Sequence, residues 1–306
     1  MTDERPRSPR QTLSYLRGLF EQHGIRPKNK LGQNFLIDLN LIDLIVRVAQ
    51  LSRDDLAVEV GSGTGGLTVR LTEQAGAVVS VEVDPAFASL TAEAVADRPN
   101  VVLLHTDVLK NKNELSPAVL EAVTNLAVKA GTKRTKLVAN LPYAVAVPVV
   151  SNLLLSDLPV ERMVVTVQWE IAERLLARPG TKDYGALAVL VQSLAHVELV
   201  RQLPPAAFWP RPQVESAIMR VRPSAAKRAH VVAEVGSVQR FRGFLRDLYV
   251  HRRKNLRGAL AGWPRGRRAK EDVDRTLAEL DIPGSIRAED LDVEQHVRLC
   301  AAFGGE

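Results

Sequence analysis

The chain has 306 residues, 46% of them hydrophobic, and 41 Lys and Arg against 35 Asp and Glu give it a net charge of +6. This length and composition predict a globular protein with one large and one smaller domain. A single cysteine, Cys300, excludes an internal disulfide and a CxxC zinc site. The N-terminus does not resemble a signal peptide, and no run of about 18 apolar residues occurs, so we predict a cytoplasmic protein without membrane spans.

The first thirty residues contain seven basic and three acidic side chains. We predict a basic N-terminal arm over residues 1–30, with a short helix at residues 12–23. Residues 31–36, LGQNFL, then form a polar turn, and residues 38–51 repeat apolar side chains at helical spacing. Taken alone, Asn34 in this turn is best explained as a turn-forming or capping residue.

A strand, a glycine-rich loop and a helix follow one another after this segment. Residues 56–60 are mostly apolar, residues 61–66 read GSGTGG, and residues 67–72 begin a helix. This order is typical of the first crossover of a doubly wound α/β sheet, where glycines let the backbone approach a nucleotide. The loop itself suits dinucleotides and S-adenosylmethionine equally.

Two carboxylates stand at the ends of the next two strands. Glu82 ends the strand at residues 78–83, twenty-one residues after Gly61, and Asp107 closes the strand at residues 101–106. Open α/β sheets bind ligands at the carboxyl ends of their strands. We therefore predict that Glu82 accepts both ribose hydroxyls of an adenosine, in preference to a solvated loop position. Asp107 could take the amino group of the adenine.

The fourth strand, residues 136–140, ends in Asn140-Leu-Pro-Tyr143. Pro142 lacks an amide donor and stops the strand, so its tip presents an amide, a carbonyl and an aromatic ring. The Asn140 side chain and the Leu141 carbonyl could accept both N–H groups of an adenine amine and localise its lone pair, while Tyr143 stacks on the ring. The alternative is a proline turn whose tyrosine packs in the core.

The middle of the chain continues with further strands and helices. We predict a helix over residues 147–155, a strand over 162–168, a helix over 170–176, and strands over 188–203 and 214–222. A proline-rich segment at residues 204–212 separates the last two and would be stiff and extended. It could hold Phe208 or Trp209 as a second aromatic wall opposite Tyr143, although packing at a domain interface explains Trp209 equally well.

Beyond Pro223 the chain is predicted to be helical, at residues 238–250, 252–260, 270–280 and 293–303, with a helix start at 288–290. Residues 240–270 hold eleven basic side chains and one acid, a local charge of +10. One-sided runs of this kind indicate a polyanionic partner. We predict domains at residues 1–30, 31–223 and 224–306, the last a helical domain that binds this polyanion; the resemblance described below implies that the polyanion is RNA.

Taken together, these motifs resemble the ribosomal RNA adenine dimethyltransferases that act on the small subunit, from about residue 30 to residue 303. Macrolide-resistance methyltransferases of the large subunit are related to the same family. The resemblance rests on LGQNFL (31–36), EVGSGTG (59–65), VEVD (81–84), TDVL (106–109), NLPY (140–143), KDYGALAVLVQ (182–192), FWPRPQVESA (208–217), HRRKNLRGAL (251–260) and LDVEQHVRL (291–299).

The resemblance implies S-adenosylmethionine as cofactor and a Rossmann-like class I methyltransferase sheet with a small C-terminal all-helical domain. It implies that Asn34 binds the cofactor and is not simply a turn-forming or capping residue. The cofactor-binding residues it implies are Asn34, Leu36, Glu59, Gly61, Gly63, Gly65, Glu82, Asp107 and Asn140. The catalytic residues it implies are Asn140, Leu141, Pro142, Tyr143 and Phe208. Ala144 and Trp169 depart from the family pattern, in which Asn and Lys are more usual.

The implied reaction is dimethylation at N6 of two adjacent adenosines near the 3′ end of 16S ribosomal RNA. We expect a metal-free monomer that acts on this RNA within a pre-30S particle and needs no general base. Three alternatives remain: a large-subunit methyltransferase of the resistance type, a non-catalytic RNA- or DNA-binding assembly factor on the same fold, and a nicotinamide dehydrogenase. A nicotinamide dehydrogenase would give no functional explanation for the NLPY motif or for the arginine cluster.

Overall fold

The computed structural model describes residues 12–25, 33–262 and 268–304. The predicted basic arm before Thr12, the first residues of LGQNFL and residues 263–267 of the basic window lie outside the described residues. The chain divides into two compact units: residues up to 172 group with residues 198–222, and residues 173–197 group with residues from 223 onward.

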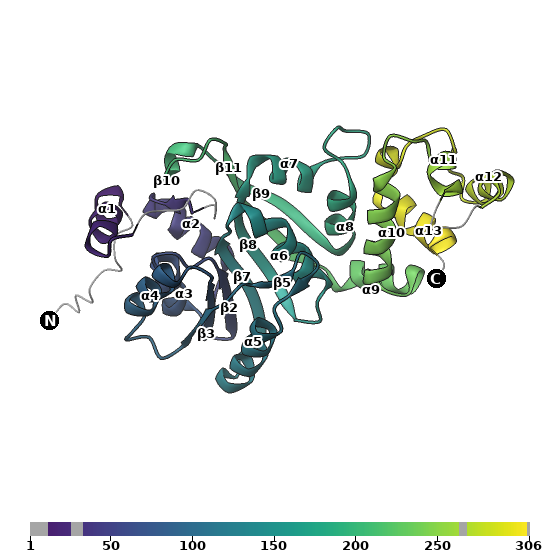
Figure 1. Ribbon diagram of the computed structural model, residues 1–306. Helices are drawn as coiled ribbons and strands as arrows, with labels where there is room; N and C mark the ends of the chain where they lie inside the picture. Colours follow the sequence, from purple (N-terminus) through teal and green to yellow (C-terminus); the bar gives the residue numbers. More distant parts are fainter. Residues whose placement is uncertain (1–11, 26–32, 263–267, 305–306) are drawn as a thin grey trace. The chain divides into compact units, whose positions relative to one another are not determined.

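The first unit is built on a seven-stranded sheet with the order β4-β3-β2-β7-β8-β11-β9 (Figure 1). Neighbouring strands from β4 to β8 run parallel, and β11 is antiparallel to β8. The predicted α/β class is confirmed. The strands are β2 (Asp55–Val60), β3 (Ala77–Glu82), β4 (Val101–His105), β7 (Arg134–Asn140), β8 (Val160–Gln168), β9 (Ala195–Leu203) and β11 (Ser216–Pro223).

The order of the strands reverses at β2. From β2 the chain adds β3 and β4 on one side and then returns to place β7 on the other. Connections leave the two neighbouring strands in opposite directions at such a switch point, and a crevice opens outside their carboxyl ends. The strand tips at Val60, Glu82 and Asn140 therefore meet at one edge of the sheet.

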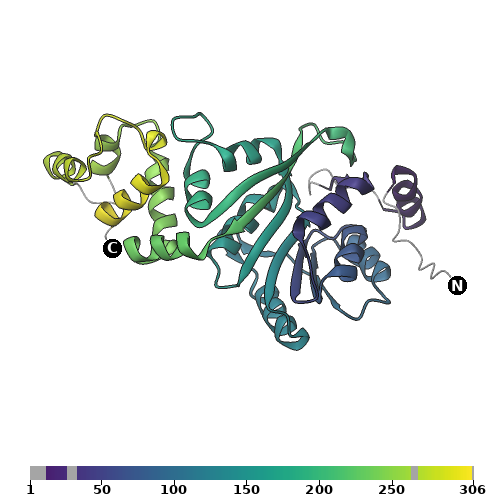
Figure 2. The ribbon, with the colours of Figure 1, turned by 180° about the vertical axis from the view of Figure 1, so that it is seen from behind.

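Helices cover both faces of this sheet, as the two opposite views show (Figures 1 and 2). On one face α2 buries Ile42, Ile45 and Val46 against Val138 of β7 and Val164 of β8. Such an apolar stripe at helical spacing fixes the rotation of the helix on the sheet. The helices of this unit are α1 (Leu13–Gln22), α2 (Leu39–Ala49), α3 (Gly66–Gln74), α4 (Pro85–Ala94), α5 (Pro117–Ala130) and α6 (Tyr143–Leu155); α7 (Trp169–Leu176) contains the division between the two units.

A small two-stranded sheet links two motifs that are far apart in the sequence. β1 (Phe35–Leu36) pairs antiparallel with β10 (Phe208–Trp209), in the register Phe35↔Trp209 and Leu36↔Phe208. β10 follows the 3₁₀ turn η2 (Pro205–Ala207). The QNFL turn is thus held by the proline-rich segment.

The predicted strand over residues 188–203 was partly wrong. The structure forms α8 (Ala186–Leu194) first, and only Ala195–Leu203 is a strand. Most of α8 is buried, and a continuously apolar run shows no period that separates a buried helix from a buried strand. The hairpin of β5 (Leu109–Asn111) and β6 (Glu114–Leu115) and the helix α5 were not predicted, and α6 begins at Tyr143, four residues earlier than expected.

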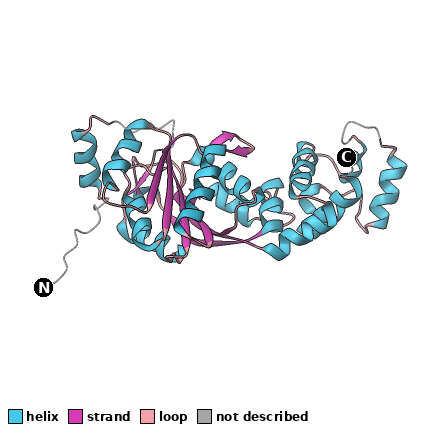
Figure 3. Cartoon of the chain, turned by 90° about the horizontal axis from the view of Figure 1, so that it is seen from below, coloured by secondary structure: helices cyan, strands magenta, loops and turns pink. Residues whose placement is uncertain are grey.

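The second unit is helical from residue 225 onward (Figure 3). Its helices after α8 are α9 (Ala225–Val235), α10 (Val238–Val250), α11 (Leu256–Ala261), α12 (Lys270–Glu279) and α13 (Val293–Phe303), with the 3₁₀ turn η3 (Ala288–Asp290). The Lys227 ammonium donates to the carbonyls of Gln192 and Ala195, at 2.8 and 2.9 Å. It thus provides hydrogen-bond donors for two backbone carbonyls at the C-terminal end of α8. The domain boundaries proposed from the sequence did not include residues 173–197 with these helices.

None of the helices in the described part of the chain has the length and apolar character to cross a membrane.

Candidate functional site

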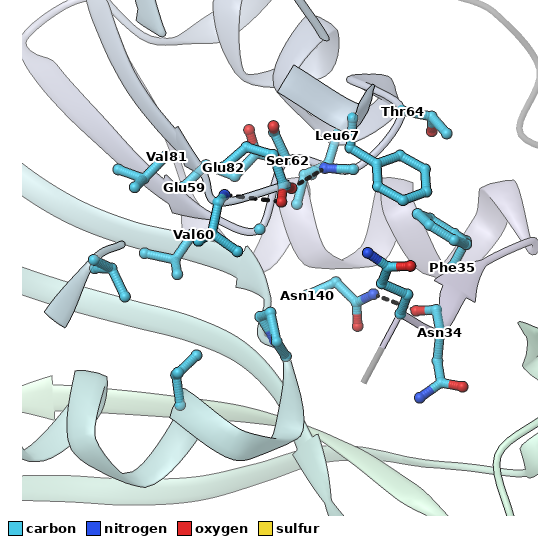
Figure 4. Close-up of a pocket in the computed structure, with 18 of the residues that line it drawn as sticks. Asn34, Phe35, Glu59, Val60, Ser62, Thr64, Leu67, Val81, Glu82 and Asn140 are labelled. Carbon is cyan, nitrogen blue, oxygen red and sulfur yellow. Dashed lines mark hydrogen bonds between the residues drawn. The ribbon is translucent and has the colours of Figure 1, made fainter. Parts of the chain in front are cut away.

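A cavity of about 260 Å³ opens at the carboxyl ends of the parallel strands (Figure 4). It lies at the switch point between β2 and β7, where α/β sheets hold ligands. Nine of the predicted site residues line it: Asn34, Leu36, Glu59, Gly61, Gly63, Glu82, Asp107, Asn140 and Pro142. Four others do not: Gly65, Leu141, Tyr143 and Phe208.

The glycine loop forms one wall of the cavity in a backbone conformation that favours glycine. Gly61 and Gly63 have φ of +79° and +59°. A Cβ on Gly61 would lie 2.9 Å from the ring of Pro142, and one on Gly63 would lie 2.9 Å from the ring of Phe35. The loop therefore packs directly against both the NLPY tip and the QNFL turn. Gly65, with φ of +76°, instead sits where a Cβ would meet α4, so its role is in helix packing.

Glu82 organises this loop as well as facing the cavity. Its Oε2 accepts a hydrogen bond from the Gly63 amide at 2.9 Å, and its Oε1 accepts from the Val83 and Asp84 amides, each at 3.0 Å. A carboxylate has about four acceptor positions, so one remains for a ligand hydroxyl. Asp107 is exposed at the cavity rim, and its Oδ1 accepts from the Leu109 amide at 2.8 Å.

Glu59 lies at the floor of the cavity and is 1% exposed. Its Oε2 accepts hydrogen bonds from the hydroxyls of Thr68 and Ser80, at 2.6 and 2.8 Å. Burial raises the pKa of this carboxyl to about 7; the two hydroxyl bonds oppose the rise, and the nearby charge of Glu82 adds to it. Among the residues that the structure describes, those that line the cavity include the acids Glu59, Glu82 and Asp107 but no Lys, Arg or His. In a chain of net charge +6, this cavity thus favours a cation.

The Asn140 side chain is oriented by one hydrogen bond across the cavity. Its Nδ2 donates to the backbone carbonyl of Asn34 at 2.9 Å (Figure 4). A carbonyl can only accept, so the amide nitrogen must face Asn34 and Oδ1 must face the other way. The site therefore holds the acceptor of this amide in a defined direction, which is what binding an amine requires. The Leu141 side chain is buried beside it, at 2% exposed.

The structure places the two predicted aromatic walls differently. Tyr143 begins α6, and its hydroxyl lies 2.8 Å from Oγ of Ser216 on β11. Burial raises the pKa of the Tyr143 phenol, and the Ser216 bond opposes this rise. Phe208 is 2% exposed and packs in the core beside Leu36, with which it pairs. It does not present an open face, and it could stack on a base only after this part of the core had opened.

Trp209 belongs to an aromatic cluster at the N-terminal helix. Its ring centroid is 5.4 Å from that of Phe20 on α1, and Phe20 in turn contacts Phe35 and Phe87, at centroid distances of 5.3 and 5.6 Å. Phe35 also faces Gly63. This cluster joins α1 to the cavity wall, and no local pattern in the sequence indicates that these four rings meet.

Sequence reasoning also missed an apolar side of the cavity. Val83 lines it and is 52% exposed, and Val108 and Phe87 contribute further apolar surface. The sequence signal for this apolar side was Val83, a valine between the acids Glu82 and Asp84 at a strand tip. An apolar side chain at such a site indicates a surface that a planar ring bound next to the Glu82 carboxylate would cover.

Comparison with known proteins gives consistent matches over almost the whole chain. The sequence model of the family described as "Ribosomal RNA adenine dimethylase" matches residues 24–296. The ribosomal RNA small subunit methyltransferase A of Geobacillus kaustophilus is 37% identical over 286 residues, covering 93% of this chain and 94% of its own. That of Bacillus cereus is 37% identical over 296 residues, covering 95% and 96%.

Solved structures are similar as well. A dimethyladenosine transferase from Plasmodium falciparum superposes with a TM-score of 0.67 at 22% identity, covering 86% of this chain and 94% of its own, and shows the same fold. The 23S rRNA methyltransferase ErmE superposes with a TM-score of 0.60 at 25% identity, covering 88% and 99%.

Proposed function

Because the chain belongs to the ribosomal RNA adenine dimethylase family, we propose that it transfers methyl groups from S-adenosylmethionine to N6 of two adjacent adenosines near the 3′ end of small-subunit ribosomal RNA. The product is N6,N6-dimethyladenosine. Membership of the family confirms the resemblance drawn from the motifs. The single observation that supports this reaction best is the Asn140 amide, held by Asn34 at the edge of an acidic cavity.

The cavity suits S-adenosylmethionine in its charge and in the polar and apolar groups that line it. This cofactor carries a sulfonium and an ammonium group, and the described lining residues offer Glu59, Glu82 and Asp107 and no basic side chain. The remaining acceptor position of Glu82 fits the ribose, the Oδ2 of Asp107 fits the adenine amino group, and Val83 offers an apolar surface to the adenine ring. When bound, the cofactor supplies an electrophilic methyl group.

The chain's own contribution to the reaction is positioning. The Asn140 Oδ1 and the Leu141 carbonyl accept the two N–H groups of the target amine and draw the nitrogen toward tetrahedral geometry. Tyr143 stacks on the base, an interaction worth about 1–3 kcal/mol. Alignment of this kind, with oriented dipoles, accounts for catalysis without a general base, because the methylated amine is acidic and releases its proton to water.

The partner that fits this site is RNA of the small subunit within a pre-30S particle, bound by a monomer. The target base must leave its stack, at a cost of a few kcal/mol that is smaller where the RNA is already looped. The basic residues of the second unit would contact phosphates, so binding should weaken steeply with salt. A large-subunit substrate is the alternative, because ErmE has a similar structure, but the names of the relatives that match nearly full length favour the small subunit.

The decisive experiment is mass spectrometry of adenosines after unmethylated small-subunit particles are incubated with the protein and S-adenosylmethionine. We expect two dimethylated adenosines near the 3′ end of the RNA, and none in a matched reaction with large-subunit RNA. Dimethylation of the large-subunit RNA alone would establish the alternative. No methylation of either RNA would contradict the proposed reaction.

A further inference from the structure

The ring of Tyr143 is fixed at both ends. At its backbone end it follows Pro142, whose ring lies so close to Gly61 that a Cβ on the glycine would come within 2.9 Å. At its other end the phenol hydroxyl lies 2.8 Å from Oγ of Ser216. The first contact belongs to the cofactor loop. The second involves a strand that has no assigned role in the reaction.

Ser216 provides a rigid point of attachment. It is 0% exposed and begins β11, which pairs with β8 without interruption from Ser216↔Gln168 to Val221↔Met163. The neighbouring amide of Trp169 also donates to the Glu215 carbonyl at 2.9 Å. A side chain on a paired strand holds its partner more precisely than one on a loop.

The same strand sets the position of the amine-binding amide. Asn140 of β7 pairs with Thr166 of β8, and Gln168, two residues further along β8, pairs with Ser216. Residues two apart on a strand lie on the same face. β8 therefore fixes the distance between the Asn140 amide and the hydroxyl that holds Tyr143, so the two groups that grip the base share one frame.

We propose that Ser216 is a positioning residue for methyl transfer: its hydroxyl holds the Tyr143 phenol, so that the ring presents a fixed face to the target base beside Asn140. This inference rests on the proposed function. Without Ser216 the part-buried phenol hydroxyl loses this hydrogen-bond partner. Leaving such a group unpaired is unfavourable, so the ring should turn to find water and give up its stacking position.

A double-mutant cycle separates this role from a general structural one. Initial rates on unmethylated small-subunit particles are measured for wild type, Ser216→Ala, Tyr143→Phe and the double variant. We expect Ser216→Ala to lower kcat/KM for the particle about tenfold, the effect of losing one hydrogen bond in a buried setting. S-adenosylmethionine affinity by calorimetry should not change. With Phe at position 143 there is no phenol to hold, so Ser216→Ala should have no further effect. Independent, multiplying effects of the two changes would overturn the inference.

A spectroscopic readout tests the tether without activity. The chain has four tyrosines, so ¹³Cζ-labelled tyrosine gives four signals, and the one lost in Tyr143→Phe is that of Tyr143. This signal should shift in Ser216→Ala. The matched control is Ser193→Ala, which removes another buried hydroxyl, 4% exposed and donating to the Leu190 carbonyl at 2.8 Å on α8.

The control should leave both the Tyr143 signal and kcat/KM as in wild type. An unmoved Tyr143 signal in Ser216→Ala would refute the tether itself. A wild-type protein that methylates no adenosine would remove the proposed function and this inference with it. Wild-type activity combined with additive variants would remove this inference alone.

Discussion

Replacing Asn140 by alanine removes the group on which the proposed chemistry depends. The change deletes Oδ1, the proposed acceptor for the target amine, and Nδ2, which donates to the Asn34 carbonyl at 2.9 Å. A hydrogen bond to a group that gains charge contributes about 1.5–3 kcal/mol. At about 1.4 kcal/mol per factor of ten, the loss of the acceptor alone should lower kcat by about 10- to 150-fold. A misplaced QNFL turn would add to this.

Single-turnover methylation of unmethylated small-subunit particles measures the chemical step directly. S-adenosylmethionine affinity, measured in parallel, should change much less than the rate. Asn140→Asp is a useful second variant, because it keeps an oxygen toward the amine but turns another toward the Asn34 carbonyl, where two acceptors repel; it should also be slow. The matched control is Asn100→Ala, since the Asn100 amide likewise donates to backbone carbonyls, at 3.0 and 3.2 Å, but outside the cavity.

The control should retain the wild-type rate at a temperature where it is folded. A rate for Asn140→Ala within about twofold of wild type, a difference of less than about half a kcal/mol, would refute the amide mechanism. A fall in cofactor affinity that equals the fall in rate would show that the amide serves the cofactor instead of the target base.

Three further predictions concern the frame around the site. Gly61→Ala should lower both cofactor affinity and the methylation rate, because the new Cβ would collide with Pro142. The matched control is Gly131→Ala, where φ is +65° and no atom lies within 4 Å of the new Cβ. It should show only the cost of the left-handed backbone, a loss of about 1–2 kcal/mol of stability in thermal unfolding. Burial raises the pKa of Glu59 from an ordinary 4.5 to about 7, so between these pH values the folded protein keeps a proton that the unfolded chain loses. The free energy of unfolding should therefore fall as the pH rises from 4.5 to about 7. Glu59→Gln should flatten the dependence of Tm on pH in this range. Lys136→Met should destabilise the protein by about 1.5–3 kcal/mol in denaturant unfolding, because Lys136 is 3% exposed and donates to the buried Asp55 carboxylate at 3.0 Å, which then keeps Arg134 as its charged partner.

The residues predicted best from the sequence are those at strand tips. Glu82 and Asn140 are the last residues of β3 and β7, and Asp107 lies two residues after the end of β4; in a parallel sheet all such strand tips meet at one edge. Local patterns therefore placed them at the cavity without any knowledge of long-range contacts. The same logic placed Gly61 and Gly63, since a strand, a glycine loop and a helix form a local unit.

The residues predicted least well depend on pairings between distant segments. Phe208 is aromatic and follows prolines, which suggested an exposed wall, but its position is decided by pairing with Leu36, 172 residues earlier in the chain. The aromatic cluster of Phe20 and Trp209 depends on the same pairing. Residues 186–194 show another limit, because a fully buried helix and a fully buried strand have the same apolar composition.

The glycine loop shows why a motif can be recognised for one reason and be required for another. Glycines in such loops are usually explained by the close approach of a ligand. Here a Cβ at Gly61 or Gly63 would first meet protein atoms, the ring of Pro142 in one case and the ring of Phe35 in the other. Pro142 directly precedes Tyr143, the ring proposed to stack on the base, and Phe35 follows Asn34, whose carbonyl orients Asn140. The loop proposed to receive the methyl donor thus also contacts both segments that carry the groups proposed to hold the methyl acceptor, so a change in the loop should disturb the two substrates together.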